Sequence, residues 1–317
     1  MRSPPSDSQL LAMLEPRLGT GAVETRLARE AAYERRVLGM GRNFFHVENW
    51  YSIHGWMRAA LTLAGLHARG RRNARAIRRV THVVSLPNLP PQLDGFRILH
   101  LSDLHLDIAP DMPAAIARAV SGVACDCCVI TGDFRARTHG PWQPCMEGLA
   151  EVLEEIDVPV HAVLGNHDSL RMVPAMEAMG IRVLLNEHVT LERAGARLYV
   201  AGVDDPHFHR ADDIDAALAG LPVTEPRILL AHSPEIWREA AAAGVDLYLC
   251  GHTHGGQICL PGGYPILRNA ACPPDLVRGP WRWERMQGYT SAGTGSCVID
   301  VRLNCPPEVT LHVLAGC

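Results

Sequence analysis

Apolar residues in the middle of the chain form short runs that are separated by amphipathic stretches. The run FRILHLS (96–102) is rich in aliphatic residues and follows a glycine, as expected of a buried strand. The stretches between such runs repeat their apolar residues at helical spacing, so strands and helices should alternate in an α/β fold. The predicted strands are 96–102, 127–131, 159–165, 181–185, 188–192, 197–203, 227–232 and 246–250, and the predicted helices are 112–122, 145–157, 170–179, 211–219 and 235–243.

The first 85 residues follow a different pattern. Two short helices are predicted at 8–18 and 21–39, and the segment 44–66 repeats Val47, Trp50 and Ile53 at helical spacing before a cluster of arginines. An aromatic amphipathic helix followed by arginines is typical of an interfacial membrane anchor. The alternative is a helix that packs on the rest of the protein, with solvated arginines. The proline-rich joint that follows divides the chain into a helical extension (1–85) and a main domain (86–317).

Charge separates the same two parts. Residues 1–80 contain 14 arginines and 6 acidic residues, a net charge of +8, while the rest of the chain carries −12. A main domain this acidic argues against nucleic acid as a partner. All 30 basic residues are arginines, which excludes any mechanism that needs a lysine.

Neither a membrane span nor a disulfide framework is expected. No run reaches the 18 apolar residues of a spanning helix, and no secretory signal follows Met1. The 10 cysteines form no paired CxxC motifs, and a chain of this length does not need disulfides. We therefore expect a cytoplasmic protein that is peripheral on the inner membrane face if residues 44–79 contact anionic lipid.

Five small polar clusters each follow a predicted strand. The ends of the strands in an α/β sheet meet at one edge, where ligand sites form. Each cluster alone is weak evidence for a ligand site, because a DxH or GD pair also occurs in an ordinary turn. GNHD and GHTH are stronger evidence, because they place bulky polar residues directly after buried strands. The side chains expected to meet are Asp103, His105, Asp133, Asn166, His232, His252 and His254.

The chemistry of these side chains indicates metal binding. Two carboxylates, one amide and four imidazoles supply seven oxygen and nitrogen donors, more than one catalytic metal with open positions needs. Such a set suits two ions of Mn, Zn or Fe. The sequence therefore predicts a dinuclear centre held by oxygen and nitrogen alone.

The order DLH, GD, GNHD, AH and GHTH resembles the calcineurin-like metallophosphoesterases. The segments LPNLPPQLDGFRILHLSDLHL, CGHTHGGQICLPG and NCPPEVTLHVL are similar to the YkuE-like bacterial branch of that superfamily. The resemblance covers about residues 86–314. It implies an α/β fold of four layers, an αββα sandwich in which two β-sheets face each other between helices.

The resemblance also implies roles for the clustered residues. One metal would be held by Asp103, His105 and His254, the other by Asn166, His232 and His252, and Asp133 would bridge them. His167 would protonate the leaving group, and Asp168 would orient His167. Relatives often carry an acidic residue where this chain has Ala136, so the flanking Arg135 and Arg137 could face an anionic substrate instead.

A phosphoester substrate follows from the resemblance, and the presence of both His105 and His167 favours a phosphodiesterase. In such an enzyme a metal-bound hydroxide attacks phosphorus. One alternative is a pyrophosphatase of a nucleotide-linked lipid such as UDP-diacylglucosamine. Another is a non-catalytic protein-binding scaffold, which would be expected to have lost ligands, whereas all seven are present here.

Overall fold

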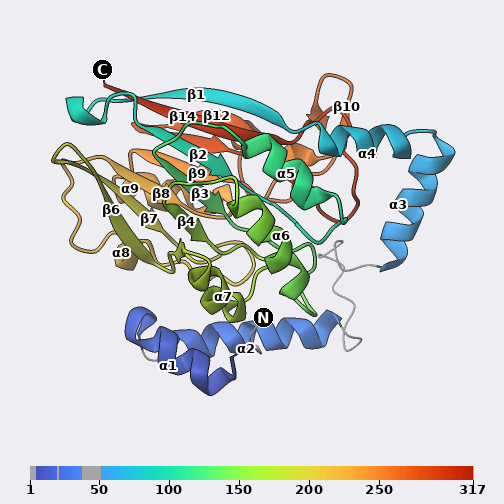
Figure 1. Ribbon diagram of the computed structural model, residues 1–317, viewed down its shortest axis with the longest axis horizontal. Helices are drawn as coiled ribbons and strands as arrows, with labels where there is room; N and C mark the ends of the chain where they lie inside the picture. The colour runs from blue at the N-terminus through green and yellow to red at the C-terminus, as the bar shows by residue number, and fades with distance from the viewer. Residues whose placement is uncertain (1–4, 20, 38–50, 317) are drawn as a thin grey trace.

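Two six-stranded β-sheets face each other at the centre of the molecule (Figure 1). The computed structural model describes residues 5–19, 21–37 and 51–316, and of residues 34–37, 51–54 and 56 it describes only the backbone. In spatial order, the first sheet contains β1 (Arg78–Leu86), β14 (Glu308–Gly316), β2 (Arg97–Leu101), β3 (Cys127–Thr131), β4 (Val160–Val163) and β5 (Ile181–Val183). The second contains β12 (Gly279–Trp283), β13 (Met286–Thr290), β9 (Leu247–Cys250), β8 (Arg227–Leu230), β7 (Ala196–Gly202) and β6 (Glu187–Arg193).

Helices cover the outer faces of both sheets, which confirms the predicted four-layer α/β sandwich. Apolar side chains of both sheets, such as Ile98, Val129 and Ile228, form a core between the sheets. Separate cores lie under the helices on each outer face. The helices are α1 (Asp7–Leu18), α2 (Ala22–Val37), α3 (Tyr51–Leu63), α4 (His67–Arg75), α5 (Met112–Val120), α6 (Gln143–Leu153), α7 (Val173–Ala178), α8 (Ile214–Ala217) and α9 (Trp237–Ala242). Short 3₁₀ turns lie at Pro91–Leu93, Leu170–Met172, Pro234–Ile236, His254–Gly256 and Pro274–Leu276.

The strands that precede the polar clusters run parallel to one another within each sheet. Strands β2 to β5 are parallel, and the connections between them contain α5, α6 and α7, as the alternating sequence pattern predicts. In the second sheet β7, β8 and β9 are also parallel. The carboxyl ends of these strands therefore lie at a common edge of each sheet.

Strand β1 ties the N-terminal part of the chain to the main domain. It pairs in parallel with β14 over nine residues, from Arg78 opposite Glu308 to Leu86 opposite Gly316. The boundary predicted at residue 85 therefore falls inside a strand of the first sheet. The arginine-rich sequence hid this strand, because its outer positions are exposed and polar.

Helices α1 and α2 pack on the same body through apolar and ionic contacts. Leu10 and Leu14 join the core under α7. The buried Arg26 of α2 pairs with Glu30 at 2.7 Å and with Asp204 at 2.9 Å. The other oxygen of Glu30 accepts a hydrogen bond from Ser169 Oγ at 2.5 Å. The extension thus supports the loop that follows β4.

Helix α3 projects from one end of the molecule and packs on α4 (Figure 1). The aromatic positions predicted between 44 and 50 lie outside the described residues, as do the side chains of Ile53 and Trp56. Within the ranges that the structure describes, no helix has the length and apolarity to cross a bilayer.

Candidate metal centre

Five loops meet at the edge where the parallel strands of the two sheets end. The loops are joined by backbone hydrogen bonds: His105 N–H donates to Asp133 O at 3.0 Å, and Gly251 N–H donates to His232 O at 2.8 Å. These bonds cross from strand to strand within each sheet. The predicted residues follow β2 (Asp103, His105), β3 (Asp133), β4 (Asn166, His167, Asp168), β8 (His232) and β9 (His252, His254).

The backbone at this edge is strained and tightly packed. Five of the seven predicted ligands have a positive φ, between 42° and 69°, a region that residues other than glycine seldom occupy; they are Asp103, His105, Asp133, His252 and His254. Such strain clusters at functional sites. Two glycines allow the loops to approach: a Cβ on Gly165 would lie 2.2 Å from Asp133 Oδ1, and one on Gly251 would lie 1.8 Å from Ser102 Oγ.

One half of the cluster contains Asp103, His105 and His254. His254 Nε2 lies 3.3 Å from Asp103 Oδ1 and 3.1 Å from His105 Nε2. His105 Nε2 lies 3.7 Å from Asp133 Oδ2. All four side chains are buried. Their ligand atoms therefore face a common point.

The other half contains Asn166, His232 and His252. His232 Nε2 lies 3.0 Å from Asn166 Oδ1 and 3.1 Å from His252 Nδ1. It also lies 3.3 Å from Asp133 Oδ2, the same oxygen that faces His105. Asp133 thus stands between the two halves.

The donor set fits metal ions. Two donors about 2.0–2.2 Å from one metal are about 3.0–3.5 Å apart at tetrahedral or octahedral angles, close to the spacings seen here. His105 and His232 each donate from Nδ1 to a backbone carbonyl, of Arg135 at 2.9 Å and of Thr131 at 2.8 Å. His252 does so from Nε2 to Asn269 O at 2.6 Å. In each ring the opposite nitrogen is therefore oriented into the cluster, as in ligand histidines.

The electrostatics of the cluster also call for a cation. Burial lowers the pKa of His252 and of His254, so both rings are neutral, which is the form that binds metal. Burial also acts to lower the pKa of His232, but the Asp133 carboxylate opposes it and raises that pKa to about 10. Without a metal, His232 therefore carries a proton between buried carboxylates. A bound metal ion would supply this positive charge in place of the proton.

Arg302, which sequence reasoning missed, supports His254. It is fully buried, and Nη1 donates to Ala292 O at 2.7 Å and to His254 O at 2.9 Å. Nη2 lies 3.1 Å from His254 Nδ1, but it also has two carbonyl acceptors, on Gly293 and Gly295. Arginine nitrogens only donate hydrogen bonds, so Arg302 holds the loop of His254 mainly through the His254, Ala292, Gly293 and Gly295 carbonyls.

His167 and Asp168 lie beside the cluster, but they do not form the pair that the resemblance implied. His167 Nδ1 donates to Ala136 O at 3.0 Å, and Nε2 lies 3.8 Å from Asp133 Oδ2. Asp168 instead accepts backbone N–H groups of Asp133, Phe134 and Gly165 at 2.8–3.0 Å. Burial raises the pKa of Asp168 to about 7, with the Asp133 charge acting in the same direction. The carbonyl of Ala136, rather than Asp168, therefore orients His167.

The two arginines expected near the substrate are placed differently from each other. The buried Arg135 uses its guanidinium on backbone carbonyls, at 3.1 Å for both Thr138 and Gly140, and also contacts His167 O. The Arg135 guanidinium is therefore directed at the backbone of its own loop, and we assign Arg135 no substrate contact. Arg137 is exposed.

A cavity of about 310 Å³ opens beside the cluster. Asp133, His167 and His254 form one part of its wall, and Met57 of α3 forms another. Ile266 and Leu267 stand at its rim with exposed fractions of 58% and 68%. The remaining apolar lining comes from Ile258, Val298 and Ile299. A polar centre and an apolar wall therefore share one cavity.

Comparison with known proteins identifies the family. The family described as calcineurin-like phosphoesterase matches residues 96–256, which contain all the clustered residues. The chain is 28% identical over 254 residues to the uncharacterized metallophosphoesterase YkoQ of Bacillus subtilis, covering 77% of this chain and 93% of that one. The chain belongs to the calcineurin-like phosphoesterases and is a metallophosphoesterase, as the motifs predict.

Two further relatives carry functional names. Phosphodiesterase YaeI of Escherichia coli is 29% identical over 236 residues, which are 68% of this chain and 81% of YaeI. UDP-2,3-diacylglucosamine pyrophosphatase LpxG of Chlamydia trachomatis is 26% identical over 294 residues, which are 72% of this chain and 86% of LpxG. Both names describe cleavage of a phosphoester or phosphoanhydride.

Proposed function

We propose that the protein is a phosphodiesterase with a centre for two metal ions. The observation that carries this proposal is the position of Asp133, whose Oδ2 lies 3.7 Å from His105 Nε2 and 3.3 Å from His232 Nε2. One metal would be held by Asp103, His105 and His254 and the other by Asn166, His232 and His252, with Asp133 shared. When bound, a metal pair supplies Lewis acidity toward phosphoryl oxygens and lowers the pKa of water.

In this proposal His167 protonates the leaving oxygen. Its Nδ1 is held by Ala136 O, so Nε2 is the nitrogen that faces the cavity. A proton on Nε2 would pass to the oxygen as the phosphorus–oxygen bond breaks. A diester leaving group needs this proton most when its alcohol is a weak acid. The ring centroid of the neighbouring His105 lies 5.0 Å from that of His167.

A second candidate is the hydrolysis of a nucleotide-linked lipid such as UDP-diacylglucosamine. The apolar wall of the cavity favours it, because acyl chains would lie against Ile258, Ile266 and Leu267 while the phosphates face the polar centre. Exposed apolar side chains at a cavity rim are a feature of ligand or membrane contact. The name of the relative LpxG agrees with this candidate.

A turnover screen tests both candidates. We expect hydrolysis of a water-soluble aryl phosphodiester in preference to the matching monoester, with metal-stripped protein inactive until Mn, Zn or Fe(II) is added. If the lipid candidate holds, UDP-diacylglucosamine is cleaved faster than UDP-glucosamine. The double variant Ile266→Ser, Leu267→Ser then raises the KM for the acylated substrate, because the apolar contact is lost. Initial rates over a range of substrate concentrations provide the comparison.

Leu260→Ser is the matched control for that variant. Leu260 has an exposed fraction of 55% but does not line the cavity, so its removal should leave both KM values unchanged. A preference for the monoester would contradict the phosphodiesterase. Normal metal binding without turnover of any phosphoester would instead favour the non-catalytic scaffold.

We also propose that the protein binds anionic membranes peripherally on the cytoplasmic face through residues 44–79. In the described part of this segment Leu63 has an exposed fraction of 89%, and Met57 lines the cavity. The arginines after α3 contribute less to membrane attraction than their number suggests. Arg71 and Arg75 pair with Asp300, and Arg79 donates to carbonyls at the end of α5. Within the arginine cluster that follows α3, the exposed arginines that make none of these contacts are Arg69, Arg72 and Arg78.

Co-sedimentation with vesicles tests this membrane proposal. Three available arginines at about 1 kcal/mol each give an attraction of about 3 kcal/mol to an anionic surface. We expect binding to phosphatidylserine vesicles at low salt and release at 1 M salt, where the Debye length is about 3 Å. Arg69→Gln with Arg72→Gln should weaken binding, whereas Arg197→Gln, an exposed arginine on the opposite sheet, should not. Equal binding to neutral vesicles would contradict the electrostatic part of the proposal.

A further inference from the structure

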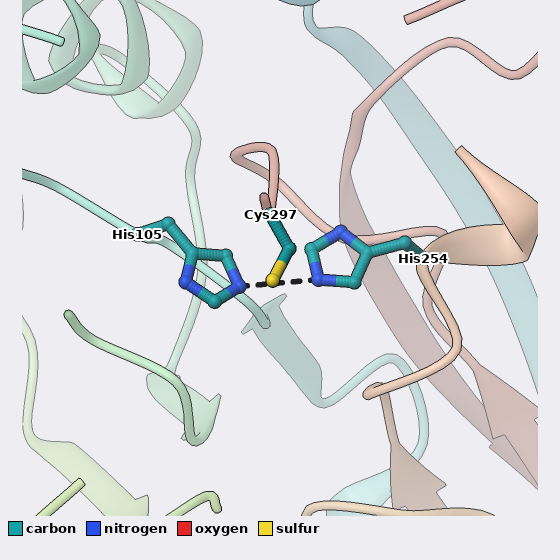
Figure 2. Close-up of side chains that lie close together, drawn as sticks. All are labelled: His105, His254 and Cys297. Carbon is teal, nitrogen blue, oxygen red and sulfur yellow. Dashed lines mark hydrogen bonds between the residues drawn. The ribbon is translucent and has the colours of Figure 1, made fainter. Parts of the chain in front are cut away.

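The sulfur of Cys297 reaches the half of the centre that contains His105 and His254. Cys297 lies on the loop between β13 and β14, far in sequence from both histidines. Its Sγ atom and one ring nitrogen of each histidine all lie within 4.8 Å of one another, and Figure 2 shows the sulfur beside the two rings. The two rings are stacked, with their Nε2 atoms 3.1 Å apart. The three side chains thus converge on one space.

The loop that carries Cys297 is held in place by specific contacts. The side chain of Gln257 accepts the backbone N–H of Cys297 at 2.8 Å and donates to the carbonyls of Cys297 and Ile299 at 2.8 and 3.0 Å. The next residue, Val298, has a φ of 64°, which is costly for a β-branched side chain. A strained turn braced by a side-chain amide therefore fixes the sulfur at the centre.

We propose that Cys297 is a ligand of the metal that Asp103, His105 and His254 would hold. The inference rests on the metal centre proposed above but not on the identity of the substrate. As the sulfur–metal bond forms, the thiol loses its proton to solvent, and no oxidant or reductant is needed. This half of the centre would then have nitrogen, oxygen and sulfur donors, in place of the oxygen and nitrogen set that the sequence predicts.

A sulfur ligand makes the two halves of the centre chemically different. Thiolate donors select Zn or Fe(II) over Mn, whose preferred ligands are carboxylate, carbonyl and water oxygens. The half with Asn166, His232 and His252 includes no cysteine in its described ligand cluster. The protein should therefore prefer Zn in one position and accept a wider range of metals in the other.

Cobalt substitution tests the proposal directly. Co(II) bound to a thiolate has a sulfur-to-metal charge-transfer absorption in the near ultraviolet, while its visible d–d bands report binding by any ligand. We expect both absorptions when metal-free full-length protein is titrated anaerobically with Co(II). Cys297→Ser should lose the ultraviolet band and keep the d–d bands. It should also lower the affinity for Zn relative to the affinity for Mn. Loss of an outer-shell partner costs about 10–100-fold in metal affinity, and loss of a direct ligand should cost at least as much.

Cys272→Ser is the matched control, because Cys272 is also partly exposed but belongs to none of the clusters of described residues that could hold a metal. It should retain the ultraviolet band. Circular dichroism and thermal melting check that the variants remain folded. A d–d spectrum without the ultraviolet band in the unmodified protein, or a band that survives in Cys297→Ser, overturns the sulfur ligand alone. Absence of d–d bands overturns the metal centre as well.

Discussion

Asp133→Asn should abolish turnover and deplete the protein of metal. Oδ1 of Asp133 accepts the backbone N–H of His167 at 2.9 Å, and the asparagine oxygen can keep that bond. Oδ2, the atom that faces both halves of the cluster, becomes an N–H₂ group that cannot bind a metal. Both ions lose a ligand at once, so we expect metal affinity to fall by at least about 100-fold. Elemental analysis of protein purified without chelator, together with initial rates, measures both effects.

Asp111→Asn provides the control for this result. Asp111 is exposed and pairs with Arg75 at 2.7 Å, outside the cluster. Its variant should retain its metal and its turnover. Unchanged metal content in Asp133→Asn would contradict the shared position of this carboxylate.

His167→Ala should separate metal binding from catalysis. Nε2 of His167 lies 3.8 Å from Asp133 Oδ2, and the proposal gives it the proton of the leaving group rather than a metal. We expect normal metal content and turnover slower by about 10²–10⁴-fold for substrates with poor leaving groups. The loss should shrink for nitrophenyl esters, whose leaving oxygen needs little protonation. A series of diesters with graded leaving-group pKa measures this dependence.

His188→Ala is the corresponding control, since His188 is half-buried on β6 and donates to Ala217 O at 3.0 Å. Its turnover should be unchanged across the series. If His167→Ala slowed activated and unactivated esters equally, His167 would have some role other than proton donation.

The central part of the fold could be predicted because its sequence pattern is local. CCVIT predicts β3 to the residue, since the run is apolar, lies between polar residues and is buried on both faces. Asp103, Asp133, Asn166 and His232 could be found because each follows such a run, and strand ends in an α/β sheet share an edge.

The parts of the fold that could not be predicted depend on contacts between segments that are distant in the sequence. Strand β1 is concealed by Arg78 and Arg79, and its partner lies at the other end of the chain. Residues 259–288, for which the sequence pattern predicts no strand, contain the β10–β11 hairpin (Cys259–Leu260 and Tyr264–Pro265), the strand β12 and the start of β13. The expected role of Asp168 was wrong because it came from its position beside His167, whereas its hydrogen bonds go to backbone groups.

Cys297 and Arg302 were missed for a related reason. Neither follows a buried strand, and both belong to a loop whose sequence has no periodic pattern. An arginine between Val301 and Leu303 was the available signal, since a charge within an apolar sequence needs buried partners. Cys297 and Arg302 reach the centre only because the loop before β14 folds back onto the histidines that follow β9.

The pairing of β1 with β14 has a consequence for how the chain is made. Arg78 and Glu308 are register partners, so 230 residues must be synthesised after Arg78 before its partner appears. At about 5–20 residues per second, translation of that stretch takes about 12–46 s. During this interval the nascent β1 has an unpaired edge that other chains could join. Arg78 and Arg79 at its start act as charged gatekeepers against such association until the end of the chain arrives.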